Sequence, residues 1–410
     1  MALPDHPPTP PPVTVVTEPD RGPRAAGAEA PTGFRPDVEG LRALAILLVL
    51  AYHASVPPAT GGFVGVDVFF VISGYVITGV LFRSNPGDAR SFFGDFYARR
   101  ARRIVPAVVL VIVATTLASY HWLGFIAGDQ TATDGKWAVG FLANFHFSAL
   151  GTNYLASQTP ASPLQNFWSL AVEEQFYLAY PAIFLLVARA RSSFSPRPRL
   201  AVIVSVIVAA SLAWSVVTTR SNAIASYFSP FTRAWELGIG ALVAIGATGI
   251  ARLPARLMRP VGWCGVAVVL VAATRDDAHT VYPGFAAMLP VIGTALVIGA
   301  GESGLRFGPS ALLAQPPVRF VGRISYSLDL WHWPILAIVA RYFNTTQSWR
   351  VNALWLLVAV ALSIVSYLTV EQPIQRSPRL TRGPVGRIAL GRAISGAGFA
   401  VLAIEGAIHP

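Results

Sequence analysis

The sequence predicts an all-α polytopic integral membrane protein with about 10–11 transmembrane helices and a cytoplasmic N-terminus. Of its 410 residues, 54% are hydrophobic and only 12% are charged, which is about half the charged fraction of soluble domains. Apolar runs of roughly 17–22 residues recur along the chain, and a helix of that length crosses a bilayer. The third observation is that the basic residues fall mostly in short loops between these runs.

Hydropathy places the segments in order along the chain. The first 33 residues are rich in Pro, Ala, Gly and Thr, and we interpret them as a disordered cytoplasmic tail. A membrane domain covers residues 34–370, and residues 371–410 are expected to form a basic cytoplasmic linker and an extra eleventh helix. The segment 137–150 is too short and too polar for a span, so we expect an interfacial or re-entrant piece. The predicted spans are residues 41–56, 64–82, 104–122, 167–188, 200–217, 231–249, 260–273, 284–300, 325–342, 351–370 and 390–407.

The distribution of basic residues sets the orientation. With the N-terminus inside, 25 of the 31 basic residues lie on the cytoplasmic side, as the positive-inside rule requires. The net charge of +11 could indicate a nucleic-acid partner, but charges placed in this way act as orientation signals instead. The single cysteine, Cys264, falls within a span, where we expect a small buried side chain; the sequence predicts no disulfide and no metal site.

The first apolar segment carries the most informative pair of residues. Arg42 and His53 are eleven residues apart, which on an α-helix makes three turns plus roughly 20° and a rise of about 16 Å. They therefore lie on one stripe, with Arg42 near the membrane surface and His53 well inside. Ionisable groups inside a membrane helix are costly and mark functional sites, so the pair predicts a buried reaction site. The alternative is a histidine that is hydrogen-bonded between helices.

The second apolar segment contains GGFVGVDVFFVISGY at residues 61–75, with Asp67 one turn into the predicted helix. An unpaired carboxylate there would be costly, so we expect Asp67 to join a functional site or a polar network. Ser73 and the glycines that follow it permit close helix approach or local unwinding, and a small-residue packing face is the alternative.

Four arginines gather in FYARRARRIVP, residues 96–106. If this segment is helical, Arg99 pairs with Arg102 and Arg100 with Arg103 at i,i+3 spacing. Guanidinium groups clustered in this way suit phosphates, which they bind bidentately. The alternative is a positively charged anchor that contacts lipid headgroups.

A pair of carboxylates stands inside NFWSLAVEEQFYLAYP, residues 166–181, where Glu173 and Tyr177 lie one turn apart. Helix rise places Glu173 roughly 9 Å and His53 about 12 Å below the outer surface. Both groups can therefore meet in the outer half of the membrane, and we expect Glu173 or another acid to orient the imidazole of His53, as in general-base arrangements. A further histidine, His332, lies between two tryptophans in GRISYSLDLWHWPIL, residues 322–336, where pocket lining and helix packing are equal alternatives.

Taken together, these motifs resemble the membrane acyltransferase-3 family, the multi-span O-acyltransferases of bacterial envelopes and of some antibiotic pathways, over about residues 34–370. Arg42-x10-His53 is similar to the family's Arg/Lys-x10-His signature, and the arginine run contains its Arg-x-x-Arg signature in two registers. FFVISGY and FWSLAVEEQFY fit its second-helix and Trp-Ser-Leu-x-x-Glu-x-x-Phe-Tyr segments. Asp329 departs from the family pattern, since an aromatic residue is expected before the Trp-His-Trp.

The opening FRPDVEGLRA also resembles the subgroup in which an extracytoplasmic SGNH hydrolase-like domain follows the membrane part. The chain carries no Gly-Asp-Ser type nucleophile motif. We therefore expect either a stand-alone member or one whose SGNH domain is separate or truncated.

The resemblance implies an O-acyltransferase of the bacterial cytoplasmic (inner) membrane with acyl-CoA, by family default acetyl-CoA, as donor substrate and no tightly bound cofactor. The acceptor would be a hydroxyl of an envelope glycan, glycolipid or glycosylated metabolite at the outer side, acylated directly or through an acyl-histidine. A secondary transporter or a membrane scaffold without catalysis is the alternative. The residues implied are His53, Glu173 and Arg42 for catalysis, Arg99, Arg100, Arg102 and Arg103 for the donor's phosphates, and Asp67, Ser73, Trp168, Tyr177 and His332 for the pocket.

Overall fold

The computed structural model describes residues 34–84, 87–152, 161–304, 308–345 and 347–377. Within these ranges the regular structure is helical and contains no strand. The predicted tail (residues 1–33) and the predicted eleventh helix (residues 390–407) lie outside the described residues. Among the described residues, six helices are long and apolar enough to cross a membrane, so the prediction of an all-α membrane protein with several spans is confirmed.

Ten helices of the described chain correspond to the first ten predicted spans. They are α1 (Pro36–His53), α2 (Gly65–Arg83), α3 (Ala89–Leu123), α6 (Phe167–Arg189), α7 (Pro196–Ser221), α9 (Pro230–Ile250), α10 (Ala255–Arg275), α11 (Met288–Glu302), α13 (Pro316–Tyr342) and α14 (Trp349–Ser366). Shorter elements connect or extend them: η1 (Gly62–Val64), α4 (Phe125–Val139), α5 (Ala143–Ala149), α8 (Ala223–Phe228), α12 (Pro309–Leu313), a π-helical turn (Tyr367–Glu371) and α15 (Gln372–Arg376).

Helix α3 differs most from its prediction, because it begins at Ala89 rather than near residue 104. Asp88 caps it by accepting hydrogen bonds from the backbone N–H groups of Arg90 and Ser91, which satisfies donors that a helix start leaves without partners. The arginine run therefore lies in the interior of a 35-residue helix and not in a surface loop. The segment 137–150 forms the end of α4 and the seven-residue α5, and α4 packs back against α3.

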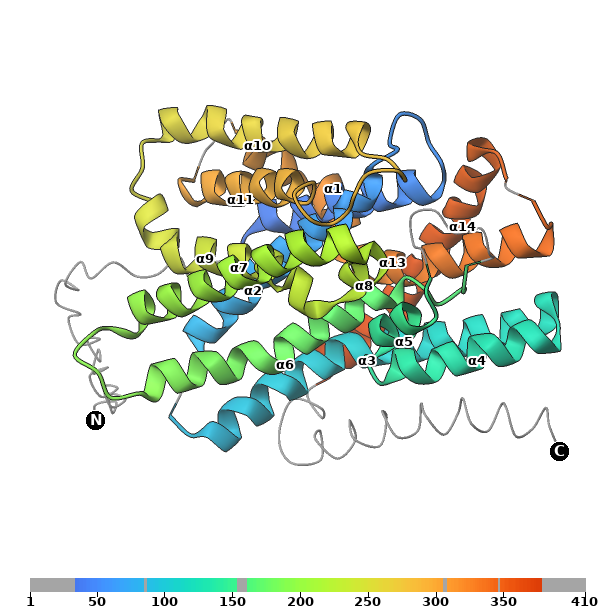
Figure 1. The fold of residues 1–410 in the computed structure, drawn as a ribbon, viewed down its shortest axis with the longest axis horizontal. Helices are drawn as coiled ribbons and strands as arrows, with labels where there is room; N and C mark the ends of the chain where they lie inside the picture. The colour runs from blue at the N-terminus through green and yellow to red at the C-terminus, as the bar shows by residue number, and fades with distance from the viewer. Residues whose placement is uncertain (1–33, 85–86, 153–160, 305–307, 346, 378–410) are drawn as a thin grey trace, which may run out of the picture.

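The centre of the bundle contains α1 and α2. Helix α1 packs against α13 and α2, while α2 also packs against α9, and α10 lies beside α11 (Figure 1). Small residues permit the α2–α9 contact, since a Cβ on Gly74 would lie 1.8 Å from the backbone oxygen of Leu237. Close approach at Gly74 thus favours the packing face that was one of the alternatives for this segment.

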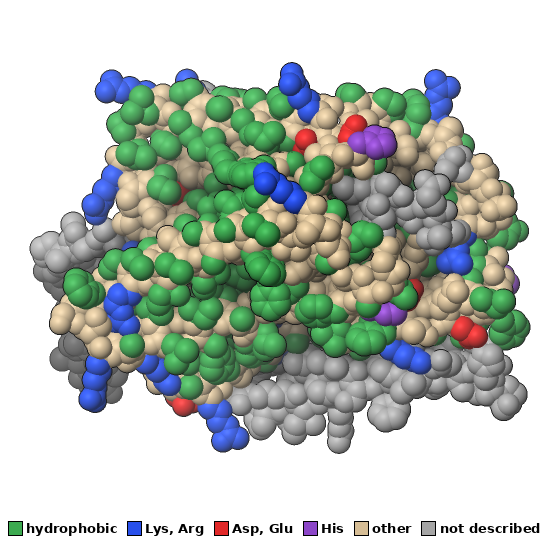
Figure 2. Space-filling model, viewed as in Figure 1, with side chains coloured by type: hydrophobic (Ala, Val, Ile, Leu, Met, Phe, Trp, Pro, Cys, Tyr) green, Lys and Arg blue, Asp and Glu red, His purple; other side chains and the backbone are tan. Residues whose placement is uncertain are grey.

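The outer helices face the lipid. Only 22% of the most apolar window of α7, 33% of that of α10 and 17% of that of α14 is buried, against 67% for α2. Figure 2 shows the resulting surface, where hydrophobic side chains form a broad band and basic side chains gather toward its margins. Cys264 lies on α10 and is exposed, so the prediction that it is buried was wrong.

Candidate active site

Arg42 and His53 are joined by a single unbroken helix. Pro36 stands at the start of α1, where its missing N–H costs nothing, and Asp37 and Glu39 complement the positive end of the helix dipole. The helix ends at His53, before Ser55 adopts a positive φ of 58°. His53 is therefore the last residue of α1, three residues before the predicted end of the span, and it lies about 16 Å from Arg42 along the axis.

His53 meets a second histidine. Its Nδ1 lies 2.9 Å from Nε2 of His332, and the two rings stack with centroids 5.1 Å apart. The ring of Trp333 approaches His53 to 4.6 Å. His332 itself is completely buried on α13, and its Nδ1 lies 3.0 Å from the backbone oxygen of Leu328. Of the two alternatives left open for His332, this contact favours a place in the site.

Glu173 does not contact His53, contrary to the prediction. Its Oε1 accepts hydrogen bonds from Ser73 Oγ at 2.9 Å and from Arg100 Nη2 at 3.0 Å. Because α3 begins at Ala89, Arg100 lies about 17 Å along that helix, deep enough to meet α6 in the middle of the bundle. Glu173 consequently lies within electrostatic range of Arg42, and its hydrogen-bond partners are Ser73 and Arg100 rather than His53.

Arg100 is fully engaged by this central cluster. Its guanidinium also binds Glu174, with Nη2 and Nε lying 2.8 Å and 3.0 Å from Oε1, and it stacks on the ring of Tyr177 at 3.2 Å. Two carboxylates and an aromatic face leave this arginine little capacity for a phosphate. These contacts argue against the predicted role of Arg100 in donor binding and favour a structural one, in which it neutralises the two half-buried glutamates.

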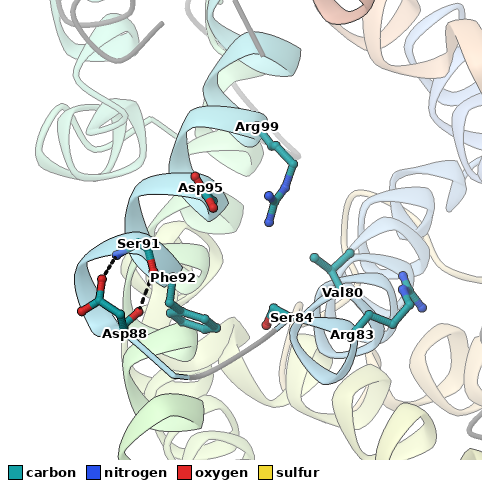
Figure 3. A pocket seen from close by; sticks show the side chains of 8 residues that line it. All are labelled: Val80, Arg83, Ser84, Asp88, Ser91, Phe92, Asp95 and Arg99. Carbon is teal, nitrogen blue, oxygen red and sulfur yellow. Dashed lines mark hydrogen bonds between the residues drawn. The ribbon is translucent and has the colours of Figure 1, made fainter. Parts of the chain in front are cut away.

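Two of the remaining arginines of the run line separate hollows. Arg99 lines a hollow of about 390 Å³ between the end of α2 and the start of α3, together with Arg83, Asp88 and Asp95 (Figure 3). Arg103 lines a larger cavity of about 760 Å³. Arg102 is half-buried and lines neither.

This larger cavity, called here the arginine cavity, lies where α1 begins and reaches Arg42. Six arginines and two glutamates line it: Arg35, Arg42, Arg83, Arg103, Arg197, Arg323, Glu39 and Glu371. Some of these charges are already paired: Arg35 binds Asp37 and Glu302 at 2.7 Å, and Glu39 binds Arg319 at 2.8 Å. Four others have no carboxylate partner in the part of the chain that the structure describes, namely Arg42, Arg83, Arg103 and Arg197. Arginines without such partners in a cavity of this size suit a polyanionic ligand.

Asp67 lies in a closed ionic network rather than in an open pocket. Arg233 Nη1 lies 2.9 Å from Asp67 Oδ1 and 2.9 Å from Glu236 Oε1, and the hydroxyl of Tyr282 donates to Asp67. All the charged side chains are at most 1% exposed. The predicted pocket residue Trp168 belongs here as well, with its ring 5.6 Å from the Arg233 guanidinium. Asp67 and Trp168 are therefore buried network residues. Arg233 and Tyr282 supply the partners without which a carboxylate inside a membrane helix would be costly.

Sequence reasoning missed Asp329 as part of the site. It lies one turn before His332 on α13, and its carboxylate is within electrostatic range of Glu173 and Arg42. Its backbone oxygen accepts a hydrogen bond from Asn166 at 2.7 Å. Two features of the sequence could have indicated this role. Asp329 departs from the family pattern, and its three-residue spacing from His332 places both residues on one face of the helix.

The ionised form of Asp276, an acid beside the ionic network, is disfavoured by its surroundings. Asp276 follows the end of α10, and its Oδ2 is buried without a hydrogen-bond partner among the described residues. Burial, together with the negative charges of Asp67 and Asp277, raises the pKa of Asp276 to about 6 from an ordinary value of 3.8. The folded protein thus binds this proton more tightly than the unfolded chain does.

Stability should accordingly fall as the pH rises from about 4 through 6, because ionised Asp276 is disfavoured only in the folded state. We expect Asp276→Asn to raise the melting temperature at pH 8 and to leave it nearly unchanged at pH 4. The neighbouring Asp277 is the matched control, since the backbone N–H groups of His279 and Thr280 lower its pKa. Asp277→Asn should give no stabilisation at pH 8. Equal effects of the two variants in thermal unfolding would contradict the assignment.

The fold and the site define a multi-span helical membrane protein with an arginine-lined cavity at one end of α1 and a histidine pair at the other. The acyltransferase-3 family, described as an acyltransferase domain, matches residues 35–370 of the chain. The protein therefore belongs to this family of membrane acyltransferases, as the sequence motifs predicted. Membership of this family favours a transferase over the transporter or scaffold that the sequence left as alternatives.

Curated relatives extend the comparison. YrhL of Bacillus subtilis, named as a candidate peptidoglycan O-acetyltransferase, is 32% identical over 360 residues, which are 83% of this chain and 55% of that protein. The peptidoglycan O-acetyltransferase OatA of Listeria monocytogenes is 29% identical over 361 residues, 84% of this chain and 56% of that protein. The O-acetyltransferase OatA of Staphylococcus aureus is 29% identical over 359 residues, 84% of this chain and 57% of that protein. The chain thus spans about half the length of these relatives. No solved structure matches it.

Proposed function

We propose that the protein transfers an acetyl group from acetyl-CoA, bound at the cytoplasmic side, to a hydroxyl of an envelope glycan at the outer side of the bacterial inner membrane. Peptidoglycan is the acceptor class that the relatives' names favour. The observation that carries the proposal is the arrangement along α1, which has the arginine cavity at its first turns and His53 at its last residue. The orientation follows from the positive-inside rule.

The donor's phosphates fit the arginine cavity. Guanidinium groups without carboxylate partners bind phosphates bidentately and hold them more strongly than neutral donors do. Arg42 lines this cavity, and the pantetheine arm would extend from there toward His53. Ile46 and Leu50 pack with Leu328 between the two levels, so delivery of the thioester requires these apolar side chains to move aside.

His53 is the group that activates the acceptor. In direct transfer, the imidazole takes the hydroxyl proton while the oxygen attacks the thioester carbon, and the thiolate of CoA leaves when the tetrahedral intermediate collapses. In the covalent route, the imidazole attacks first, the thiolate leaves, and the acceptor oxygen then displaces the acyl group from the ring. Both routes end with an O-acetyl ester and CoA, whose sulfur takes up a proton.

The proposal is tested with purified protein in proteoliposomes. Acetyl-CoA carrying a labelled acetyl group is supplied on one side and soluble peptidoglycan fragments on the other, and mass spectrometry follows the label. We expect O-acetylated sugar to appear with the wild-type protein. Release of CoA without any labelled acceptor would overturn the assigned acceptor class, and the absence of both products would overturn the donor.

Donor binding should depend on the arginine cavity and not on the whole arginine run. Arg103→Gln removes a cavity guanidinium without a carboxylate partner and should weaken acetyl-CoA binding by about 10- to 100-fold, since a hydrogen bond to a charged group contributes about 1.5–3 kcal/mol. The remaining binding should be less sensitive to salt.

The matched control for this measurement is Arg99→Gln. It removes the same charge from the same helix but from the smaller hollow, so the donor's dissociation constant should change little. Calorimetric titration in detergent measures both variants. Equal losses would show that the run acts only through its summed charge, and an unchanged Arg103→Gln would remove this arginine from the donor site.

A further inference from the structure

A chain of hydrogen bonds starts at a group whose direction is fixed. The backbone oxygen of Leu328 can only accept, so His332 Nδ1, which lies 3.0 Å away, must carry a proton and donate it. In a neutral imidazole the other nitrogen then holds a lone pair. His332 Nε2 is therefore an acceptor, and His53 Nδ1, 2.9 Å from it, is the donor.

The reverse direction is disfavoured by charge. If His53 Nδ1 accepted, both nitrogens of His332 would have to carry protons and the ring would be a cation. His332 is 0% exposed, and no carboxylate of the described chain lies within ion-pair distance of it. A cation buried without a partner is costly, so the neutral arrangement holds.

We propose that His332 is a positioning residue that holds His53 in the Nδ1–H tautomer and thereby makes Nε2 of His53 the nitrogen that takes the proton or the acyl group. This inference rests on the proposed function and names the reacting atom. His332 acts through His53 and needs no contact with the substrate. When His53 Nε2 gains a proton or an acyl group, Nδ1–H still donates to His332, so the pair passes through the reaction without rearranging.

The competing explanation is that His332 only packs α13 against α1. Three variants of His332 separate the two roles. His332→Gln places an amide oxygen near the position of Nε2, where it can accept from His53. His332→Asn places its amide near the position of Nδ1, so it retains a donor for Leu328 but cannot reach His53. His332→Leu removes both hydrogen bonds and keeps most of the volume.

We expect His332→Leu and His332→Asn to lower the turnover number by about 10- to 100-fold, the effect typical of groups that orient a histidine from behind, with little change in KM for acetyl-CoA. His332→Gln should recover most of the activity. If His332 only packed the helices together, the activity of each variant would follow how well that variant folds. An Asn variant as active as wild type, or a Gln variant as inactive as the Leu variant, would therefore overturn the proposal.

A second measurement does not depend on any acyl donor. Iodoacetamide alkylates an imidazole at the nitrogen that holds the lone pair, and the Nδ1 and Nε2 products are separable after digestion. In wild type and His332→Gln, the peptide containing His53 should be alkylated at Nε2, whereas in His332→Leu the Nδ1 product should appear as well. Identical product ratios in wild type and His332→Leu would refute the tautomer assignment. If instead wild type shows Nε2 alkylation but no acetyl transfer, the proposed function fails while the tautomer assignment stands.

Discussion

Replacing His53 with alanine should abolish acetyl transfer while leaving the protein folded. A general base contributes typically about 10² to 10⁴ to the rate, and an obligate covalent carrier contributes more, so this single change is expected to have the largest effect on activity. Donor binding should survive, because the arginine cavity lies at the other end of α1, about 16 Å away. The measurement is labelled acetyl transfer in proteoliposomes together with acetyl-CoA titration.

The sharper comparison is His53→Asn. Asparagine places its amide near the position of Nδ1, so it can still donate a hydrogen bond to His332, yet it cannot take up a proton at neutral pH. A packing or hydrogen-bonding role would therefore tolerate this change, whereas a base or nucleophile would not. Substantial transfer by His53→Asn would remove the histidine from the chemistry. Recovery of labelled acetyl on His53 after incubation with donor alone would select the covalent route.

The contacts that depend on one helix could be predicted from the sequence. The stripe that joins Arg42 to His53 needs only the helical repeat, and α1 is unbroken between them. The partner of Glu173 could not be predicted in this way, because it depends on where α3 begins. Asp88 caps that helix well before the apolar segment starts, which carries Arg100 into the bundle and gives Glu173 an arginine partner in place of His53.

Partners across helices also decide the role of Asp67. Hydropathy shows correctly that a carboxylate inside a membrane helix needs a partner, but it does not identify that partner. Arg233 lies 166 residues further along the chain, and its charge could equally have been an orientation signal at a helix end. Only the packing of α2 against α9 shows that the two side chains meet. A sequence pattern therefore predicted the need for a partner, and the fold supplied its identity.

The second large effect follows from that network. Arg233→Met should destabilise the protein by about 3–5 kcal/mol, because it leaves Asp67 and Glu236 buried without their shared cation. Proteins are stable by only about 5–15 kcal/mol, so we expect little folded protein in detergent and a melting temperature far below that of wild type. Arg220→Met is the matched control, since Arg220 is exposed at the end of α7 and should be nearly neutral.

The triple variant Asp67→Asn, Arg233→Met, Glu236→Gln distinguishes a charge effect from a loss of packing. It removes the whole buried charge set, and replacing a buried ionic group by neutral side chains of similar volume costs far less than breaking it. Much of the melting temperature should therefore return in the triple variant. A triple variant as unstable as Arg233→Met would show that the guanidinium acts mainly by packing among the rings of Trp168, Tyr227 and Tyr282, which lie 4.8 to 5.6 Å from it. An Arg233→Met protein as stable as wild type would mean that the two carboxyl groups are already neutral, because neutral acids would not need the cation.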